Sequence, residues 1–237
     1  MVIDMILQLE NLEAAYGMSQ VLFGVNLNVR EQQVTCLLGR NGVGKSTTIK
    51  TIMGVLRPKM GSVRYREQEI GGMAPNKRNR LGIAYVPQGR QVFPTLTVRE
   101  NIIFGERKPK GDRAKIWALE DIYQLFPRLR ERQDFMGDRI SGGEQQMMVI
   151  ARALMQNPDL LLLDEICEGL APIVVQELAA VIPELCRQGV SVLLVEQSAK
   201  FALEVSSFCC IMEKGAVVYG DETKNISDEV FRKYMGT

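Results

Sequence analysis

The sequence predicts an α/β fold with a largely parallel central sheet, and three observations lead to this expectation. Stretches that are apolar on both faces, as buried parallel strands are, occupy 34–38, 160–163 and 190–195. Helical patterns fall between or after these stretches, for example over 174–188. The interval 96–155 contains no convincing strand, which predicts a helical insert in an otherwise alternating chain.

The first third of the chain is expected to be rich in β-structure. Residues 19–29 alternate apolar and polar side chains with one slip, which is the pattern of a half-buried strand. Residues 61–70 follow a glycine turn and predict another short strand with a polar face. Pro127 and Gly137 punctuate the helical middle segment.

The composition excludes several classes of function. Hydrophobic residues make up 46% of the 237 positions, which is enough for a substantial core. A net charge of +1 gives no electrostatic case for a nucleic-acid binder, so the basic runs 76–80 and 127–132 are interpreted as solvated faces. The sequence has no histidine, which excludes histidine triads, histidine metal sites and histidine pH switches. The five cysteines lack metal-type spacing and indicate a reducing compartment.

The sequence also indicates a soluble, cytoplasmic protein. No segment approaches the roughly 18 unbroken apolar residues that a membrane helix needs. The first ten residues carry Asp4 and Glu10 where a signal peptide would have a basic end and a clean apolar run.

A glycine-rich loop is the strongest single motif. Gly39, Gly44, Lys45 and Ser46 satisfy G-x-x-x-x-G-K-[ST] between an apolar strand and a helix. In such a loop backbone N–H groups surround phosphate oxygens, the lysine reaches the outer phosphates and the serine hydroxyl can ligate Mg²⁺. The alternative is a glycine turn that only caps a helix, but the strand before it and the helix after it favour a nucleotide site. The predicted nucleotide-binding residues here are Gly39, Arg40, Asn41, Gly42, Val43, Gly44, Lys45, Ser46 and Thr47.

Two adjacent acids end the apolar run 160–163. A carboxylate in that place is costly unless its charge is needed nearby. Asp164 is expected to hold Mg²⁺ through water, and Glu165 to polarise the water that attacks the γ-phosphate. The alternative is an ordinary surface acid pair, which the phosphate loop and the apolar strand make less attractive.

A second glycine turn precedes these acids. Ser141, Gly142 and Gly143 begin a helix whose apolar face contains Met147, Ile150, Ala151 and Leu154. Free N–H groups at such a start can bind an anion, although a lone S-G-G turn is also an ordinary helix cap.

With this order of motifs the chain resembles the ATP-binding subunits of ABC transporters over essentially its whole length. The resemblance implies one domain over 1–237, with a P-loop NTPase parallel-sheet core and an N-terminal antiparallel β subdomain. Residues 1–95 and 156–237 would form the β subdomain and core, and 96–155 the helical subdomain.

The resemblance also implies that two subunits enclose two ATP molecules. Ser141, Gly142 and Gly143, with Glu144 beside them, would then contact the γ-phosphate of ATP held by the opposite subunit. Tyr16 would stack on adenine, although it could instead be a strand aromatic of the core. Further implied roles concern the stretch 85–101. The Gln88 amide would reach Mg²⁺ or the attacking water, and the candidate contacts to a permease are Val92, Phe93 and Pro94.

Three departures from the family pattern bear on hydrolysis more than on ATP binding. Ile166 and Cys167 follow Glu165 where proline and serine or threonine are usual. Ala171 replaces an aspartate. Gln197 replaces the histidine that contacts the γ-phosphate; its amide can donate a hydrogen bond but carries no charge, and a solvent-facing helix cap is the alternative.

The stretches EGLAP and LVEQ resemble the LivF-like ATPase of branched-chain amino-acid importers. That resemblance implies a motor subunit on the inner face of the cell membrane. Its partners would be a second ATPase, identical or paralogous, two permease subunits and, indirectly, a periplasmic solute-binding protein. The alternatives are the ATPase of a urea or other ABC transporter and, less favoured, a soluble ABC ATPase that acts on nucleic acid or ribosomes, or a P-loop kinase. No nucleic-acid partner is expected.

Overall fold

The computed structural model describes residues 4–108 and 116–235. Its elements in chain order are β1 (Met5–Tyr16), β2 (Ser19–Arg30), β3 (Val34–Leu38), α1 (Lys45–Met53), β4 (Met60–Tyr65), β5 (Gln68–Glu69), α2 (Pro75–Arg80), β6 (Ile83–Val86), α3 (Val98–Ile103), α4 (Leu119–Leu125), α5 (Pro127–Glu131), α6 (Gly142–Leu154), β7 (Leu160–Asp164), α7 (Pro172–Arg187), β8 (Ser191–Glu196), α8 (Ala199–Val205), β9 (Phe208–Glu213), β10 (Ala216–Glu222) and α9 (Asp228–Met235).

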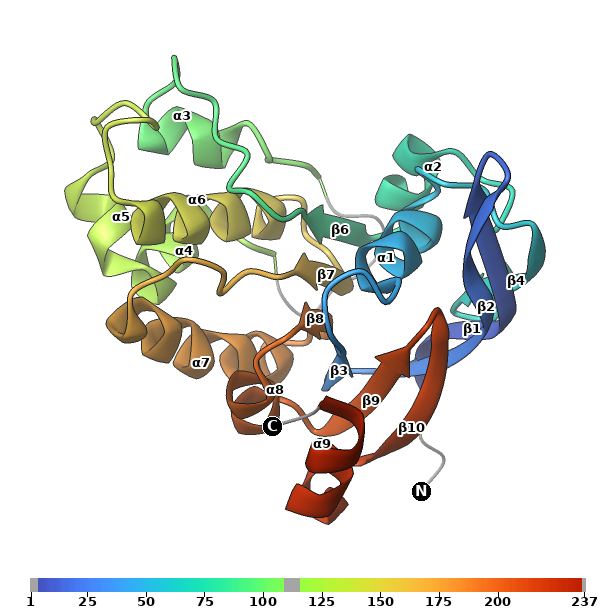
Figure 1. Cartoon of the computed structure of the whole chain (residues 1–237). Helices are drawn as coiled ribbons and strands as arrows, with labels where there is room; N and C mark the ends of the chain where they lie inside the picture. Colours follow the sequence, from blue (N-terminus) through green and yellow to red (C-terminus); the bar gives the residue numbers. More distant parts are fainter. Residues whose placement is uncertain (1–3, 109–115, 236–237) are drawn as a thin grey trace.

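The central sheet has the strand order β10-β9-β3-β8-β7-β6. All neighbours pair in parallel except β10, which runs antiparallel to β9 at one edge. A separate antiparallel sheet has the order β2-β1-β4-β5. In Figure 1 the helices α3–α7 lie on one side of the central sheet, and α1 and the antiparallel sheet lie on the other.

The two faces of the central sheet are buried in two different apolar cores. Along β7, Leu161 and Leu163 face the core formed with the helices, whereas Leu160 and Leu162 face the core shared with α1 and the antiparallel sheet. This double burial is why the run of leucines does not alternate with polar residues, as parallel strands generally do not. The buried sheet thereby fixes where its strands end, and the candidate site lies at those ends.

The predicted α/β architecture is confirmed, with differences in its elements. The strands expected at 34–38, 160–163 and 190–195 are present as β3, β7 and β8, and 19–29 lies within β2. The single strand expected over 61–70 is wrong, because Arg66 and Glu67 have positive φ and turn the chain between β4 and β5. Four further strands, β1, β6, β9 and β10, had no explicit prediction.

The middle segment is helical where it is described. Its elements α3–α6 are accompanied by one isolated bridge between Thr97 and Met136, and residues 109–115 lie outside the described part. On the helix that follows the second glycine turn, the predicted apolar face of Met147, Ile150, Ala151 and Leu154 is buried. The proposed division into subdomains at 96 and 155 stays a prediction.

The basic run 76–80 contains a buried arginine rather than only a solvated face. Arg78 is fully buried and donates hydrogen bonds to the carbonyl oxygens of Thr51, Ile52, Gly71 and Met73. It therefore satisfies carbonyl groups at the end of α1, the helix that begins at the phosphate loop. A solvated interpretation is wrong for this residue.

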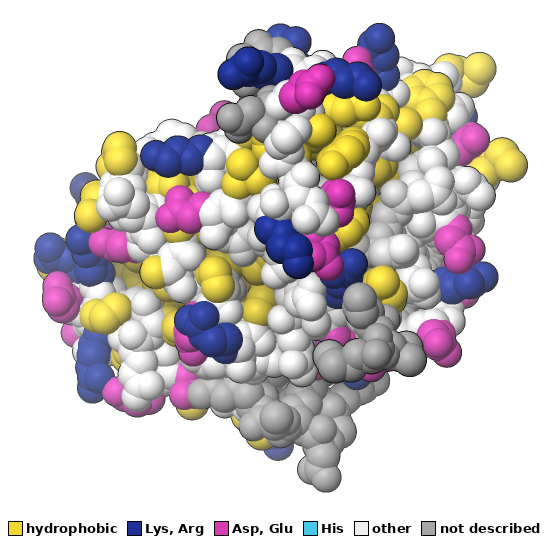
Figure 2. Space-filling view, turned by 90° about the horizontal axis from the view of Figure 1, so that it is seen from below, with side chains coloured by type: hydrophobic (Ala, Val, Ile, Leu, Met, Phe, Trp, Pro, Cys, Tyr) yellow, Lys and Arg dark blue, Asp and Glu magenta, His cyan; other side chains and the backbone are white. Residues whose placement is uncertain are grey.

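The second basic run, 127–132, does lie on the surface. Three of its side chains are about half exposed and pair with acids, as Arg128–Glu177, Arg130–Glu120 and Arg132–Glu144. On the face in Figure 2, basic and acidic side chains are interspersed. Within residues 4–108 and 116–235 we find no helix with the length and apolar character that a membrane span requires.

Candidate functional site

The glycine-rich loop connects the buried strand β3 to helix α1 at the carboxyl edge of the central sheet. Gly44 has φ of 113°, a conformation that glycine adopts without strain, and it precedes the first helical residue. A Cβ on Gly39 would lie 2.7 Å from the carbonyl oxygen of Met212. No side chain caps the start of α1, so its first N–H groups face the loop without a side-chain acceptor.

Lys45 is the buried cation of this edge. Its side chain is 3% exposed, and Nζ lies 3.0 Å from Oε1 of Glu165 and 3.0 Å from the carbonyl oxygen of Arg40. A buried ammonium needs such partners because it has left water. A phosphate oxygen that reaches Lys45 would therefore take over the place of the Glu165 carboxylate.

Asp164 meets the phosphate loop although β8 lies between its strand and β3. Helix α1 contacts β7, which brings the Ser46 hydroxyl within 3.1 Å of Asp164 Oδ1. The Tyr85 hydroxyl donates to the other oxygen, Oδ2, at 3.1 Å. Burial raises the pKa of the Asp164 carboxyl, and the hydrogen bonds from Ser46 and Tyr85 act against that rise.

Glu165 is the meeting point of three loops. It is 8% exposed and has a positive φ of 48°. Besides its ion pair with Lys45, it accepts hydrogen bonds from the amides of Gln88 at 3.1 Å and Gln197 at 3.0 Å. The structure thus brings the other three predicted catalytic side chains, Lys45, Gln88 and Gln197, to the Glu165 carboxylate. Gln88 also donates to Glu168, at 2.7 Å.

A buried acid that the motif analysis missed orders the same edge. Glu196 ends β8, is 4% exposed and accepts the backbone N–H groups of Cys167 and Gln197, both at 3.2 Å. Burial raises the pKa of Glu196. The signal was present, since Glu196 ends an apolar strand just as Asp164 does. Tyr85 was missed as well, and no motif in the sequence marks it.

Three residues that depart from the family pattern lie in the segment between Glu165 and the start of α7. Ile166 is buried in the helical core, and Cys167 is held by Glu196. Ala171 stands at the start of α7 and provides no side-chain cap.

A cleft of about 290 Å³ opens over the phosphate loop. The residues that line it are Val21, Asn41, Gly42, Gly44, Lys45, Ser46, Thr47, Gln88 and Glu165. Tyr16 is half exposed at the end of β1 and pairs with Ser19, on the hairpin that also carries Val21. Nothing in the geometry assigns Tyr16 a ligand.

The donors fit a magnesium ion that shares its shell with phosphate. Ser46, Asp164 and Gln88 offer hydroxyl, carboxylate and amide oxygens, the hard ligands that Mg²⁺ prefers. In the described ranges no three acidic or cysteine side chains gather into a metal cage. Mg²⁺ in nucleotide sites is generally held by one or two carboxylates together with phosphate and water, rather than by protein alone.

The second glycine turn lies away from these contacts, at the start of α6. Ser141 and Glu144 form a complete capping box, in which each side chain accepts the backbone N–H of the other residue. Arg90 donates to the carbonyl oxygens of Glu168 and Gly169, and a Cβ on Gly142 would lie 2.3 Å from its Nη1. Arg90 thus lies between this turn and the loop after Glu165.

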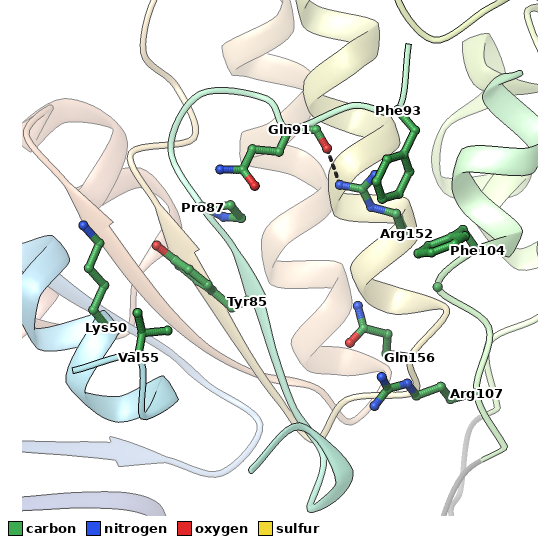
Figure 3. A pocket seen from close by; sticks show the side chains of 11 residues that line it. Lys50, Val55, Tyr85, Pro87, Gln91, Phe93, Phe104, Arg107, Arg152 and Gln156 are labelled. Atoms are coloured by element: carbon green, nitrogen blue, oxygen red, sulfur yellow. Dashed lines mark hydrogen bonds between the residues drawn. The ribbon is translucent and has the colours of Figure 1, made fainter. Parts of the chain in front are cut away.

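A groove of about 480 Å³ lies between α1 and the helices on the other side of the sheet, among them α6 (Figure 3). Phe93 packs edge-to-face on Phe104 with ring centroids 4.8 Å apart, and the Arg152 guanidinium lies 4.5 Å above the Phe93 ring. Of the three permease-contact candidates, Phe93 lines this groove, Val92 packs against the core and Pro94 is exposed.

Comparison with known proteins decides the family. The model of the ABC transporter family matches residues 22–168. This chain belongs to that family. It is an ATP-binding subunit of the ABC transporter type and an ATPase, as its sequence predicted. Members of the family work with membrane components.

Several relatives match nearly the whole chain. It is 41% identical to the high-affinity branched-chain amino acid transport ATP-binding protein BraG of Pseudomonas aeruginosa, over 91% of this chain and 92% of that one. It is 33% identical to the probable branched-chain amino acid transport ATP-binding protein LivF of Archaeoglobus fulgidus, over 94% of both. The expected resemblance to branched-chain importer ATPases is thereby confirmed.

Other similarities are broader. The lipopolysaccharide export system ATP-binding protein LptB of Haemophilus influenzae is 32% identical over 98% of this chain and 97% of its own. The crystal structure of an ADP-bound ATP-binding cassette of an ABC transporter is 27% identical, with a TM-score of 0.84 over 99% of this chain and 100% of that one. These matches confirm the fold class and leave the transported solute and its direction to be inferred.

Proposed function

We propose that this subunit drives the uptake of branched-chain amino acids by hydrolysing Mg²⁺–ATP on the cytoplasmic face of the cell membrane. The observation that carries the catalytic part is the paired contact of Ser46 with Asp164 and of Lys45 with Glu165 at one sheet edge. The solute is inferred from the similarity to BraG and LivF, because nothing in this chain would touch it.

ATP binding uses the loop 39–47 and the open start of α1. Backbone N–H groups and Lys45 hold the β- and γ-phosphates. Ser46, Asp164 and Gln88 would hold Mg²⁺, which neutralises phosphate charge when bound. Tyr16 is proposed to stack on adenine from the β1–β2 hairpin.

Glu165 is the proposed general base. Its displacement from Lys45 by a phosphate leaves a carboxylate that still accepts from the Gln88 and Gln197 amides. These two donors orient the carboxylate toward a water molecule beside the γ-phosphate. Gln197 supplies a neutral hydrogen-bond donor where the family usually has histidine, so hydrolysis proceeds without a charge at that position.

The second glycine turn serves the opposite subunit in this proposal. Ser141, Gly142, Gly143 and Glu144 lie apart from the phosphate loop of their own chain, so a second ATPase would bring them to its nucleotide. The partner is an identical or a paralogous subunit.

The groove of Figure 3 is proposed to receive a permease segment. Its wall combines the exposed aromatics Phe93 and Phe104 with three cations, Lys50, Arg107 and Arg152. An integral membrane partner that docks there places the subunit on the inner face of the membrane, and the periplasmic binding protein acts through that partner.

The catalytic proposal is tested with Glu165→Gln. We expect ATP affinity to stay the same or rise, because the variant removes the anion that competes for Lys45. Turnover should fall by about 100-fold or more, the usual contribution of a general base, and an ATP-bound dimer should accumulate in size-exclusion chromatography. Turnover close to that of the wild type, or to that of the exposed control Glu204→Gln, would show that Glu165 is not the base.

The transport proposal needs the assembled transporter. Candidate permease subunits should be co-expressed with this chain, and the assembled complex should be reconstituted in vesicles with a solute-binding protein. ATP-dependent accumulation of leucine, isoleucine or valine supports the proposal. Accumulation of urea instead, or ATP-driven movement of a lipid outward, as the similarity to LptB allows, replaces it.

A further inference from the structure

We propose that Tyr85 is a positioning residue that orients the Asp164 carboxylate toward the metal. In this proposal, a segment that occupies the groove changes how Tyr85 orients that carboxylate. The inference rests on the proposed Mg²⁺–ATP function. It starts from a single side chain that belongs to both places: its hydroxyl contacts Asp164, and its ring lines the groove.

The Asp164 carboxylate is held at both oxygens. Ser46 donates to Oδ1 and Tyr85 donates to Oδ2, both at 3.1 Å. The last torsion of an aspartate is broad, so a carboxylate with one donor can turn. Ser46 is itself a proposed metal ligand, which leaves Tyr85 as the holder that does not take part in the metal shell. Tyr85 therefore fixes which oxygen faces the cation.

The other end of the link is the groove. Tyr85 lies on β6 and is half buried, and its ring forms part of the wall with Lys50 and Val55 on one side and Phe93 on the other (Figure 3). A segment that packs on this ring restricts the rotation of the side chain that carries the hydroxyl. Tyr85 alone therefore connects the groove to the Asp164 carboxylate. Coupling between the two places needs no further residues between them.

The first half is tested by Tyr85→Phe, which keeps the ring and removes the hydroxyl. Binding of Mn²⁺ in the presence of a non-hydrolysable ATP analogue, followed by electron paramagnetic resonance, should weaken about 3- to 10-fold, which is within the usual net contribution of one hydrogen bond. Nucleotide affinity in EDTA should not change. The matched control is Tyr123→Phe, which removes a tyrosine hydroxyl bonded to Gln133 on the helical side.

The outcomes separate the inference from the proposed function. An unchanged Mn²⁺ affinity in Tyr85→Phe, or an equal loss with and without metal, overturns the positioning role. A wild type that binds no metal–nucleotide complex overturns the proposed function itself. Nucleotide binding in EDTA also shows that each variant is folded.

The second half is tested by filling the groove. Val55 is exposed and lines it, so Val55→Trp places an indole beside the Tyr85 ring. We expect Mn²⁺ affinity to change at least about twofold in the Tyr85 background and not in the Tyr85→Phe background, since coupled residues are non-additive. In protein labelled with 3-fluorotyrosine, the ¹⁹F resonance missing from Tyr85→Phe should shift in Val55→Trp. No change, or an equal change in both backgrounds, overturns the link to the groove.

Discussion

Helices α1 and α6 both begin at a glycine turn, yet their starts are built differently. The start of α1 has no side-chain cap and no acidic residue in its first turn. The start of α6 has a complete capping box and carries Glu144 in its first turn. One helix leaves its N–H groups for a ligand, whereas the other already satisfies part of them from its own chain.

The comparison indicates that a glycine turn before a helix can bind an anion by itself in one case and only together with a second subunit in another. At α1 a phosphate meets free donors and a buried lysine. At α6 a phosphate would meet a box that already contains a carboxylate, which agrees with the proposal that the phosphate arrives on a nucleotide held by another subunit. Ser141–Glu144 do not line the cleft over the phosphate loop of their own chain, in keeping with the proposed role toward a second subunit.

Lys45→Met gives the sharpest test of the α1 side. The variant keeps most of the apolar stem but removes the ammonium group that the proposal places on the outer phosphates. It also leaves Glu165 without its ion-pair partner. We expect ATP affinity to fall about 100-fold, which corresponds to about 2.7 kcal/mol. Titration with a fluorescent ATP analogue measures it. The exposed control Lys59→Met should bind as the wild type does; equal binding by both variants would remove Lys45 from the site.

Gly142→Ala should produce the next largest effect, on the α6 side. The new Cβ would lie 2.3 Å from Nη1 of Arg90 and must displace that side chain. We expect turnover to fall about 10-fold or more while the affinity for ATP stays within about twofold, since the phosphate loop is untouched. A loss of ATP affinity equal to the loss of turnover would contradict the proposal that α1 determines ATP affinity while the start of α6 affects turnover.

The cause of that loss can be separated by a second substitution. In Gly142→Ala combined with Arg90→Ala the clash is gone, so any turnover that returns measures the steric part. A double variant as inactive as Gly142→Ala assigns the glycine to direct nucleotide contact.

Ser141→Ala compares two capping boxes within one chain. Thr97 caps α3 with Glu100 in the same way and lies outside the proposed nucleotide contacts. Each substitution to alanine should lower stability by about 1 kcal/mol, or about 2–4 °C in melting temperature for a chain of this size. Only Ser141→Ala should also lower turnover, by several-fold. Equal turnover in the two variants would make the α6 box a purely structural cap.

Much of the fold could be predicted because both faces of the central strands are buried. Double burial gives apolar runs that stand out, as at 34–38 and 160–163. The strand 83–86 is buried except for the half-buried Tyr85, but it is only four residues long. The turn at Arg66 and Glu67 lacks glycine, proline or asparagine. The strand was too short to stand out as an apolar run, and the turn lacked the residues that usually mark a turn in a sequence.

The candidate site divides in the same way. Lys45 and Ser46 belong to one local motif and Asp164 and Glu165 to another, and the structure places the two pairs in contact. Tyr85 and Arg90 contact residues that are about 80 positions away in sequence, Asp164 and Glu168. Their roles depend on register between strands and on loop geometry, which no single stretch of sequence expresses.

Glu196→Gln is expected to have the smallest effect and concerns the α1 side alone. The groups that face Glu196 are the N–H groups of Cys167 and Gln197, the Cys167 thiol and the charge of Glu165. Burial is the largest influence and raises the pKa of Glu196 from its ordinary value of 4.5, so folding disfavours the charged form. The stability that the protonated form contributes is complete below pH 4.5 and is lost as pH rises through the higher folded-state pKa.

Glutamine cannot lose that contribution through ionisation. The melting temperature of the wild type should therefore fall relative to that of Glu196→Gln as the pH is raised above 4.5. Calorimetry between about pH 4.5 and 8 measures the difference. Parallel curves for wild type and Glu196→Gln would mean that the hydrogen bonds from Cys167 and Gln197 offset the effect of burial on Glu196.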